Sequence, residues 1–183
     1  LPIVAFTRML AGPIDFTPGV FNIKLNNLAD HIINNHEKRN QINTTLAHQL
    51  ALYVVIYSPI QMACDLPENY EGHPAFQFIR DVGVNWEQTK VLDGEIGDFV
   101  VIAREERETG NWFLGAISDE FANDITIDFS FLDEDKKFKC IIYKDGEDAH
   151  WNDNPLSYAI EEVEVDNSSK INFNLAAGGG LAI

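Results

Sequence analysis

The sequence has few basic residues, few cysteines and no long apolar run. Thirteen Lys and Arg stand against 29 Asp and Glu, so the 183 residues carry a formal net charge of −16. Nucleic acids and anionic membranes bind to basic surfaces, and neither is expected as a partner. The longest apolar run, residues 50–56, is far shorter than the roughly 20 residues of a membrane-spanning helix.

Acidic residues are concentrated in the second half of the chain. Residues 1–85 hold 5 basic residues (Lys and Arg) and 7 acidic ones (Asp and Glu). Residues 86–183 hold 8 basic and 22 acidic residues. The second half should therefore have a strongly solvated acidic surface, and the first half is unusually apolar. Because the chain also begins inside an apolar segment and not at Met, we expect it to be a piece of a longer protein.

The two cysteines lie in segments that are predicted to be buried. Cys64 belongs to an apolar run before Asp65, and Cys140 belongs to a run typical of a strand. Two buried free thiols are therefore expected, with a disulfide or a reactive cysteine as the alternatives. The cysteines do not indicate a cellular compartment.

Residues 1–85 have the pattern of an α/β fold. Residues 1–10 are almost entirely apolar, as in a strand buried on both faces, and the Gly- and Pro-rich segment AGPIDFTPG follows as a loop. Apolar spacing of four and three predicts a helix capped by Asn43 or Thr44 and stopped by Pro59. Residues 60–64 would form a second buried strand, and Pro74 would open another helix. Two such parallel strands need more sheet beside them, so an apolar face should remain uncovered.

From residue 86 the hydrophobic period changes to two, with turn signals about every ten residues. The alternation is clearest between Ile125 and Phe131. Seven or eight short antiparallel strands of this kind predict a β-sandwich. The run from Gly178 to Gly180 is interpreted as a bend into a last strand, because a phosphate-binding loop would be followed by a helix and a lysine.

Asp15 and Asp65 are the candidate site residues. Each follows an apolar run, as do Glu68 and Glu71, and loops at the carboxyl ends of barrel strands form the active sites of α/β barrels. Asp15 and Asp65 are therefore assigned to the rim of a substrate pocket. The competing roles are structural, because Asp15 can cap a turn and Asp65 can hold the loop before Pro67. Arg8, in an expected buried strand, would need an internal ion-pair partner.

No other pattern indicates a catalytic or metal site. The sequence has no nucleophile elbow, no zinc spacing of Cys and His, and no twelve-residue calcium loop. Trp112, Trp151 and Tyr158 could form a sugar-stacking platform on the second half, although core and edge packing is the default role of such side chains. The Asn-rich stretch at 22–43 is expected to be an exposed loop or a short irregular helix.

Six segments are specific enough to compare with a known family: LPIVAFTRMLAGPIDFTPG, INTTLAHQLALYVVIYSPIQMACDLPENYE, WEQTKVLDGEIGDFVVIAR, WFLGAISDE, YKDGEDAHW and LAAGGGLAI. Together, and in this order, they resemble the carboxyl-terminal part of glycoside hydrolase family 97. The resemblance runs over nearly the whole chain apart from residues 22–43.

This resemblance implies a parent enzyme with an amino-terminal β-sandwich, a (β/α)8 catalytic barrel and a carboxyl-terminal β domain. Residues 1–85 would be the last part of the barrel, and residues 86–183 the β-sandwich domain. Such enzymes act on α-glucosides or α-galactosides with a calcium ion in the active site, and they are exported to the bacterial periplasm or cell surface. The family's catalytic and calcium-binding carboxylates lie upstream of the segment that matches Leu1. No catalytic or metal-binding residue is therefore assigned to this chain.

Two hypotheses of different class follow. In the first, the chain is the carboxyl-terminal portion of a family 97 α-glycosidase, inactive alone, whose partners are its substrate and the remaining domains of the parent enzyme. In the second, the chain is a carbohydrate-binding or scaffolding module that binds glycans without catalysis.

Overall fold

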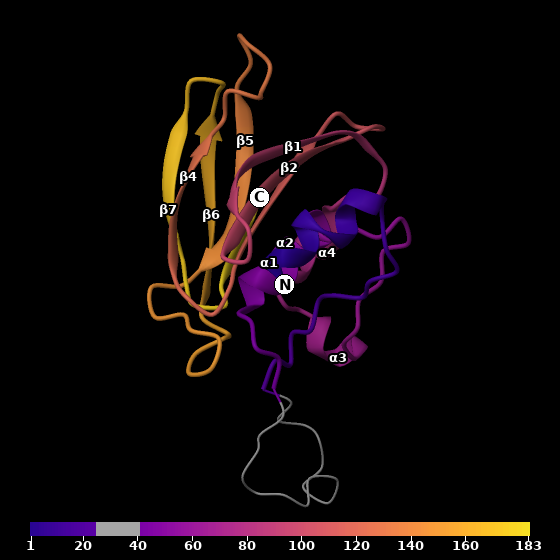
Figure 1. Ribbon diagram of the computed structural model, residues 1–183, viewed down its shortest axis with the longest axis vertical. Helices are drawn as coiled ribbons and strands as arrows, with labels where there is room; N and C mark the ends of the chain where they lie inside the picture. The colour runs from indigo at the N-terminus through magenta and orange to yellow at the C-terminus, as the bar shows by residue number, and fades with distance from the viewer. Residues whose placement is uncertain (25–40) are drawn as a thin grey trace, which may run out of the picture.

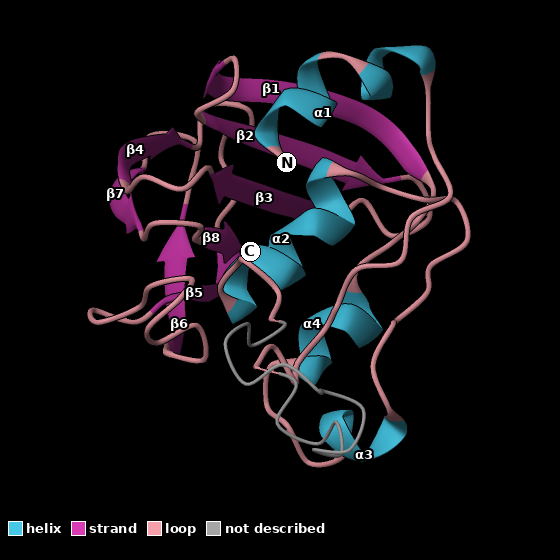
Figure 2. Ribbon diagram, turned by 60° about the horizontal axis from the view of Figure 1, so that its bottom comes forward, coloured by secondary structure: helices cyan, strands magenta, loops and turns pink. Residues whose placement is uncertain are grey.

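The computed structural model describes residues 1–24 and 41–183, and it places short helices before a compact set of strands (Figure 1). The helices lie on one face of a large antiparallel sheet, and a small second sheet lies on the other face (Figures 1 and 2). The two sheets face each other across a hydrophobic core, as in the predicted β-sandwich. No described helix has the length and apolar character needed to cross a membrane.

The first 85 residues contribute only helices and loops within their described part. The elements are α1 (Pro2–Phe6), a 3-10 helix (Arg8–Ala11), α2 (Leu46–Val55), α3 (Pro67–Tyr70) and α4 (Phe76–Asp81). The two helices predicted here are present as α2 and α4, but the cap predicted for α2 at Asn43 or Thr44 is wrong, because Thr45 is the capping residue. The expected loop or helix at 22–43 falls largely at residues 25–40, outside the described residues.

Helix α2 is the central element of the helical layer. Thr45 caps it by accepting a hydrogen bond from the backbone nitrogen of His48 at 3.2 Å, and all ten of its residues are buried. Two glycines let it lie close to the sheet. A Cβ on Gly115 would come within 2.6 Å of the carbonyl oxygen of Ala51, and one on Gly180 within 2.5 Å of the Cα of His48. The helix is thus fixed at backbone contact distance from the sheet.

The strands expected at 1–10 and 60–64 do not form. Residues 2–6 are helical, and residues 60–64 have no regular secondary structure. A short apolar run fits a buried strand or a buried helix equally well, and a parallel strand exists only with a neighbour to pair with. In consequence Arg8 is not buried: it is exposed and donates to the carbonyl oxygens of Gly12 and Pro13 at 3.2 and 3.5 Å. Cys64 is exposed as well, whereas Cys140 is buried as expected.

Every strand predicted after residue 85 is present. The eight strands are β1 (Trp86–Glu95), β2 (Phe99–Glu106), β3 (Trp112–Ser118), β4 (Asn123–Asp128), β5 (Phe138–Asp145), β6 (Tyr158–Val165), β7 (Lys170–Leu175) and β8 (Gly180–Ala182). Six of them form one sheet in the order β1-β2-β3-β8-β5-β6, and β4 pairs with β7 in the second. All pairings are antiparallel. The last strand in sequence therefore occupies the middle of the large sheet.

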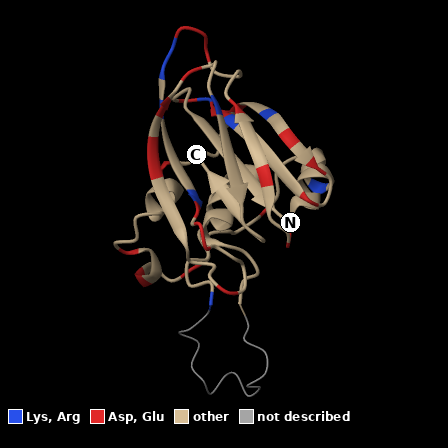
Figure 3. Ribbon diagram, turned by 90° about the vertical axis from the view of Figure 1, so that its left-hand side faces the viewer, with Lys and Arg blue, Asp and Glu red and all other residues tan. Residues whose placement is uncertain are grey.

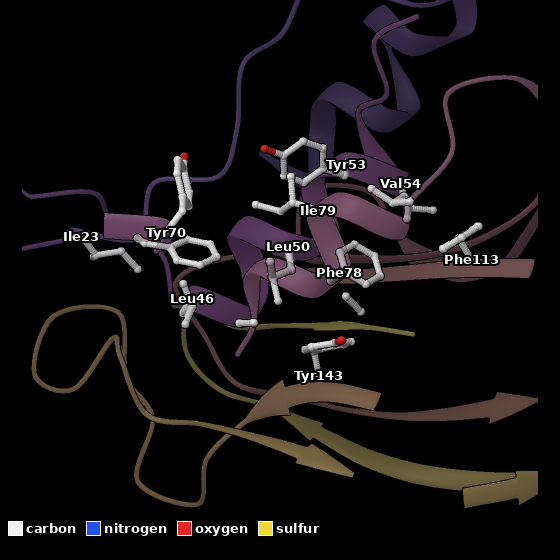
Figure 4. Close-up of a cluster of buried hydrophobic side chains, with 14 residues drawn as sticks. Ile23, Leu46, Leu50, Tyr53, Val54, Tyr70, Phe78, Ile79, Phe113 and Tyr143 are labelled. Carbon is white, nitrogen blue, oxygen red and sulfur yellow. The ribbon is translucent and has the colours of Figure 1, made fainter. Parts of the chain in front are cut away.

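Each face of the large sheet covers its own core. Between the two sheets, Ile125 and Ile127 of β4 pack with Val101, Leu114 and Leu181, and we call this cluster the sandwich core. On the opposite face, α2 and α4 pack on Phe113 and Tyr143, in what we call the helix core (Figure 4). Both cores share strands of the same sheet, so the helices and the β domain form one continuous packing unit.

The acidic charge lies mainly on the strands and turns of the β domain (Figure 3). Three glutamates of the edge strand β6 pair with lysines at 2.5 to 2.8 Å: Glu161 with Lys144 and Glu162 with Lys139 of β5, and Glu164 with Lys137 just before β5. Water and salt screen these surface pairs, so each contributes little stability. Charge on an edge strand does hinder pairing with another sheet.

Candidate functional site

Asp65 lies where two loops of the first half meet. Its Oδ2 accepts hydrogen bonds from the backbone nitrogens of Phe21 and Asn22, both at 2.7 Å. Its Oδ1 accepts from the backbone nitrogen of Leu66 at 2.8 Å and from the Asn69 side chain at 2.6 Å. Partial burial raises the pKa of this carboxyl, but the four hydrogen bonds outweigh it and leave the pKa below its usual value. Asp65 is thus an ionised carboxylate that joins the loop at 21–22 to Leu66 and to Asn69 of α3.

Two tyrosine hydroxyls also contact both of these chain segments. The Tyr53 hydroxyl lies 3.1 Å from the carbonyl oxygen of Pro18 and 2.9 Å from that of Met62. The Tyr70 hydroxyl donates to the carbonyl oxygen of Gly19 at 2.7 Å and accepts from the backbone nitrogen of Asp65 at 2.8 Å. Each hydroxyl therefore makes one contact with residues 18–19 and one with residues 62–65.

Gln49 of α2 completes the loop network. Its Oε1 accepts from the backbone nitrogens of Gly19 and Val20 at 3.0 and 3.2 Å, and its Nε2 donates to Thr44 at 2.9 Å. A Cβ on Gly19 would come within 2.4 Å of the Tyr53 hydroxyl, so this position needs a glycine both for space and for its φ of 94°. The network fixes the path of residues 18–22 over the amino-terminal half of α2.

Asp15 does not share this network. It is exposed, and no hydrogen bond among the described residues joins it to Asp65. The structural alternative considered for Asp65, that it holds the loop before Pro67, is correct in geometry. Its carboxylate already accepts four hydrogen bonds, so a substrate hydroxyl would have to compete for it. The pocket-rim assignment of Asp15 and Asp65 stays a prediction.

A second polar cluster lies buried where α2 meets β8. His48 Nδ1 lies 2.9 Å from the carbonyl oxygen of Gly179, and since a carbonyl only accepts, Nδ1 carries the proton. Its Nε2 is buried without a partner among the described residues. Burial lowers the pKa of His48 to about 4 despite the hydrogen bond to Gly179. The ring is therefore neutral at physiological pH.

Asp145 lies on the other side of the same glycine run. Its Oδ2 accepts from the backbone nitrogens of Ala176 and Gly180 at 3.0 and 2.8 Å, and its Oδ1 is buried without a partner among the described residues. Burial raises the pKa of Asp145 to about 6, although the Thr45 side chain and the backbone nitrogens of Ala176 and Gly180 act in the opposite direction. A Cβ on Gly179 would come within 2.0 Å of Oδ2. The glycine run thus lies between a buried histidine and a buried aspartate.

The described residues do not form a metal site. Within residues 1–24 and 41–183, no three His, Cys, Asp or Glu side chains are arranged so that they could hold a metal ion.

The three aromatic residues considered as a sugar platform have separate neighbours. Trp112 packs against Phe131 with ring centroids 4.8 Å apart, and Tyr158 stacks on His73 at 5.5 Å. Trp151 stacks on the adjacent His150 at 5.8 Å. These contacts are those of core and edge packing, the default role of the three side chains.

Sequence reasoning missed most of these polar contacts. Tyr53, Gln49 and His48 occupy a helix that the sequence predicts from its apolar positions alone, so their hydrogen bonds do not enter the prediction. The cluster at β8 had one available signal, because three successive glycines that lead into a strand indicate close approach of another backbone.

Comparison with known proteins covers both halves of the chain. The family model described as "Glycosyl-hydrolase 97 C-terminal, oligomerisation" matches residues 85–183. A retaining alpha-galactosidase of Bacteroides thetaiotaomicron is 35% identical over 181 residues, which are 98% of this chain and 26% of that protein. A probable retaining alpha-galactosidase of Streptomyces bingchenggensis is 32% identical over 116 residues, 63% of this chain and 16% of that protein.

Solved structures of a glycoside hydrolase family 97 enzyme from Pseudoalteromonas sp. strain K8 superpose with a TM-score of 0.90 and 52% identity. They include complexes with panose and with acarbose, and the match covers 99% of this chain and 27% of that one. The chain thus spans about a quarter of the Bacteroides and Pseudoalteromonas proteins, and it matches them across the boundary between its helical and β halves.

Proposed function

We propose that this chain, which belongs to glycoside hydrolase family 97, serves a parent enzyme that hydrolyses α-glucosidic or α-galactosidic bonds. The chain is the carboxyl-terminal portion of such a family 97 enzyme. The observation that most strongly supports this proposal is the superposition on the Pseudoalteromonas enzyme over 99% of this chain. Alone, the chain is inactive, because the acid and base of the reaction belong to upstream residues of the parent. Its own part is to complete the barrel and to attach the β domain.

Of the two sugars, α-glucosides are the proposed substrates. Identity is 52% to the enzyme bound to panose and acarbose, and 35% to the alpha-galactosidase. Panose consists of glucose units in α linkage. The higher identity therefore supports a glucoside-binding parent, with α-galactosides as the alternative.

We also propose that residues 1–85 are the last part of a (β/α)8 barrel in the parent. Several large apolar side chains of this half face outward, among them Leu10 at 79% exposure and Ile60 at 71%. Further exposed examples are Leu1, Ile3 and Leu66. Upstream strands of the parent would cover this face and give residues 60–64 the parallel neighbours that they need to form a strand.

In that setting Asp15 and Asp65 lie at the rim of the substrate pocket. The hydrogen bonds of Asp65 support a positioning role, since it fixes residues 21 and 22 and would keep their loop in place beside the substrate. A calcium ion in the parent would be bound by residues outside the described part of this chain. Export of the parent to the periplasm or cell surface is part of the same proposal.

Hydrolysis of aryl α-glucoside and aryl α-galactoside, with calcium present, tests the proposal. The chain alone should give no turnover with either, whereas the parent enzyme should cleave the glucoside faster. Turnover by the purified chain would overturn the proposed inactivity. Faster cleavage of the galactoside by the parent would reverse the substrate assignment and leave the family unchanged.

The binding-module hypothesis makes a separate prediction. Saturable binding of maltooligosaccharides to this chain, measured by calorimetry, should survive Asp15→Ala and Asp65→Ala and be lost in Trp151→Ala. The separate packing of the three aromatic side chains gives this hypothesis no structural support, and we keep it as the alternative only.

A further inference from the structure

A row of three rings joins the β domain to the loop at residues 18–22. The Tyr158 ring, on strand β6, stacks on the His73 ring with centroids 5.5 Å apart and an interplanar angle of 26°. His73 in turn lies against Phe21, with centroids 4.6 Å apart and the rings tilted by 59°. Both separations lie in the range at which aromatic pairs attract each other. We call Tyr158, His73 and Phe21 the aromatic row, and it connects strand β6 to the loop through one imidazole.

Phe21 is the residue through which the aromatic row reaches the loop. Its side chain is buried, and it also packs edge to face on Tyr70 with ring centroids 4.9 Å apart. The four successive backbone nitrogens of residues 19–22 all donate to side chains, the first two to Gln49 and the last two to Asp65. A shift of the Phe21 ring would therefore strain hydrogen bonds that fix the loop backbone.

His73 is held in place by the turn between α3 and α4. Its backbone nitrogen donates to the carbonyl oxygen of Tyr70 at 3.0 Å, and its Nδ1 accepts from the backbone nitrogen of Ala75 at 3.2 Å. Because a backbone N–H only donates, Nδ1 carries no proton. Burial lowers the pKa of His73, so the ring is neutral at pH 7. The central member of the aromatic row is thus an uncharged ring whose orientation is fixed by a hydrogen bond.

Two polar contacts also join the β domain to this part of the chain, and both are more open to water. Lys24 Nζ donates to the carbonyl oxygen of Asp153 at 2.9 Å, at an exposed position. Gln41 Nε2 donates to the carbonyl oxygen of Trp151 at 3.3 Å, at a partly buried one. Water competes for such donors, so each contact contributes little. The aromatic row, which ends on the buried Phe21, is the stronger connection.

We propose that His73 and Tyr158 are positioning residues, through which the β domain keeps the loop at 18–22 in place beside the substrate of the parent enzyme. This inference rests on the proposed function, in which the loop held by Asp65 adjoins the substrate pocket. Both residues act through Phe21, so neither is a catalytic residue. The β domain then contributes to substrate binding without providing a sugar-binding group of its own.

Two matched pairs of variants of the parent enzyme test the proposal. His73→Asn keeps an acceptor for the Ala75 nitrogen and removes the ring, whereas His73→Phe keeps a ring and removes the acceptor. At the β-domain end, Tyr158→Leu removes the ring and Tyr158→Phe removes only the hydroxyl. Two measurements are made on each variant: hydrogen exchange of the backbone amides of residues 19–22, and the separate values of kcat and KM for the aryl glycoside that the parent cleaves faster.

Loss of either ring should speed exchange of these amides about three- to tenfold, the factor that corresponds to one aromatic pair. KM should rise by a similar factor while kcat stays within about twofold, because the loop contacts bound substrate and takes no part in the chemistry. His73→Phe and Tyr158→Phe should resemble the unsubstituted enzyme in both measurements. His73→Asn combined with Tyr158→Leu should have no larger effect than either alone, since each already interrupts the aromatic row.

Unchanged exchange at residues 19–22 in Tyr158→Leu would overturn the proposal. Equal effects of His73→Asn and His73→Phe would also overturn it, because the aromatic ring would then not be what matters. Faster exchange with an unchanged KM would place the loop away from the substrate and remove the positioning role. Hydrogen exchange needs no turnover, so a parent enzyme without activity on either glycoside would contradict the proposed function and leave the exchange result to be judged separately.

Discussion

His48 donates through Nδ1 to the carbonyl oxygen of Gly179 at 2.9 Å, and this contact joins the first turns of α2 to the glycine run before β8. The two residues are 131 positions apart in sequence. Asp145 holds the same run from the other side, so two groups with opposite pKa shifts meet at one backbone segment.

Acid should weaken this junction through His48. The pKa of His48 falls from 6.5 to about 4 on folding, so its contribution to stability is complete above pH 6.5 and is lost as the pH falls toward 4. The total loss is about 3 kcal/mol. His48→Asn keeps a donor near Nδ1 and removes the titration, so urea unfolding between pH 7.5 and 4.5 should show a flatter pH dependence for this variant. An unchanged slope would exclude His48 as the source.

Asp145 should act in the opposite direction. Its pKa rises from 3.8 to about 6 on folding, so its contribution is complete below pH 3.8 and is lost as the pH rises through 6. Asp145→Asn keeps an acceptor for the nitrogens of Ala176 and Gly180 and removes the buried charge. We expect it to increase the free energy of unfolding at pH 7.5 by about 1 to 3 kcal/mol. Asp145→Ala removes the acceptor and should destabilise; equal behaviour of the two variants would contradict this account.

Gly180 should tolerate no side chain. A Cβ there would lie 2.5 Å from the Cα of His48 and 2.8 Å from its nitrogen, and neither backbone atom can move aside without shifting α2. Gly180→Ala should lower the free energy of unfolding by about 3 kcal/mol or more. Gly110→Ala is the control, because a Cβ at this position would have open space around it. Its only cost is the left-handed φ of 72°, which should lower the free energy of unfolding by about 1 kcal/mol. Thermal unfolding of both variants measures the difference.

The two candidate aspartates should differ in their effect on stability. Asp65→Ala removes the acceptor of four hydrogen bonds and should lower the free energy of unfolding by about 2 kcal/mol. Limited proteolysis should then cleave faster at residues 59–66. Asp15→Ala, at an exposed position, should change stability by less than about 0.5 kcal/mol. Equal losses from both variants would mean that the loop network is not what stabilises this region.

The β domain was predictable because its signal is local. The alternation of apolar and polar residues from Ile125 to Phe131 predicts a strand, and pairs such as Asp145-Gly146 predict a turn. Neither prediction depends on residues far away in the sequence. The strands expected at 1–10 and 60–64 depend on neighbours that this chain does not provide, and an apolar run alone does not distinguish helix from strand. His48 and Asp145 were missed for a related reason, since each meets Gly179 or Gly180 only after folding.

The position of β8 in the sheet also determines the order of events during synthesis. The ribbons β1-β2-β3 and β5-β6 are joined in the large sheet only through β8, the last described strand to be translated. Until residues 180–182 leave the ribosome, the facing edges of β3 and β5 have no partner between them and both remain open to other chains. Completion of this sheet therefore waits for the synthesis of β8, and the two open edges remain exposed to aggregation until then.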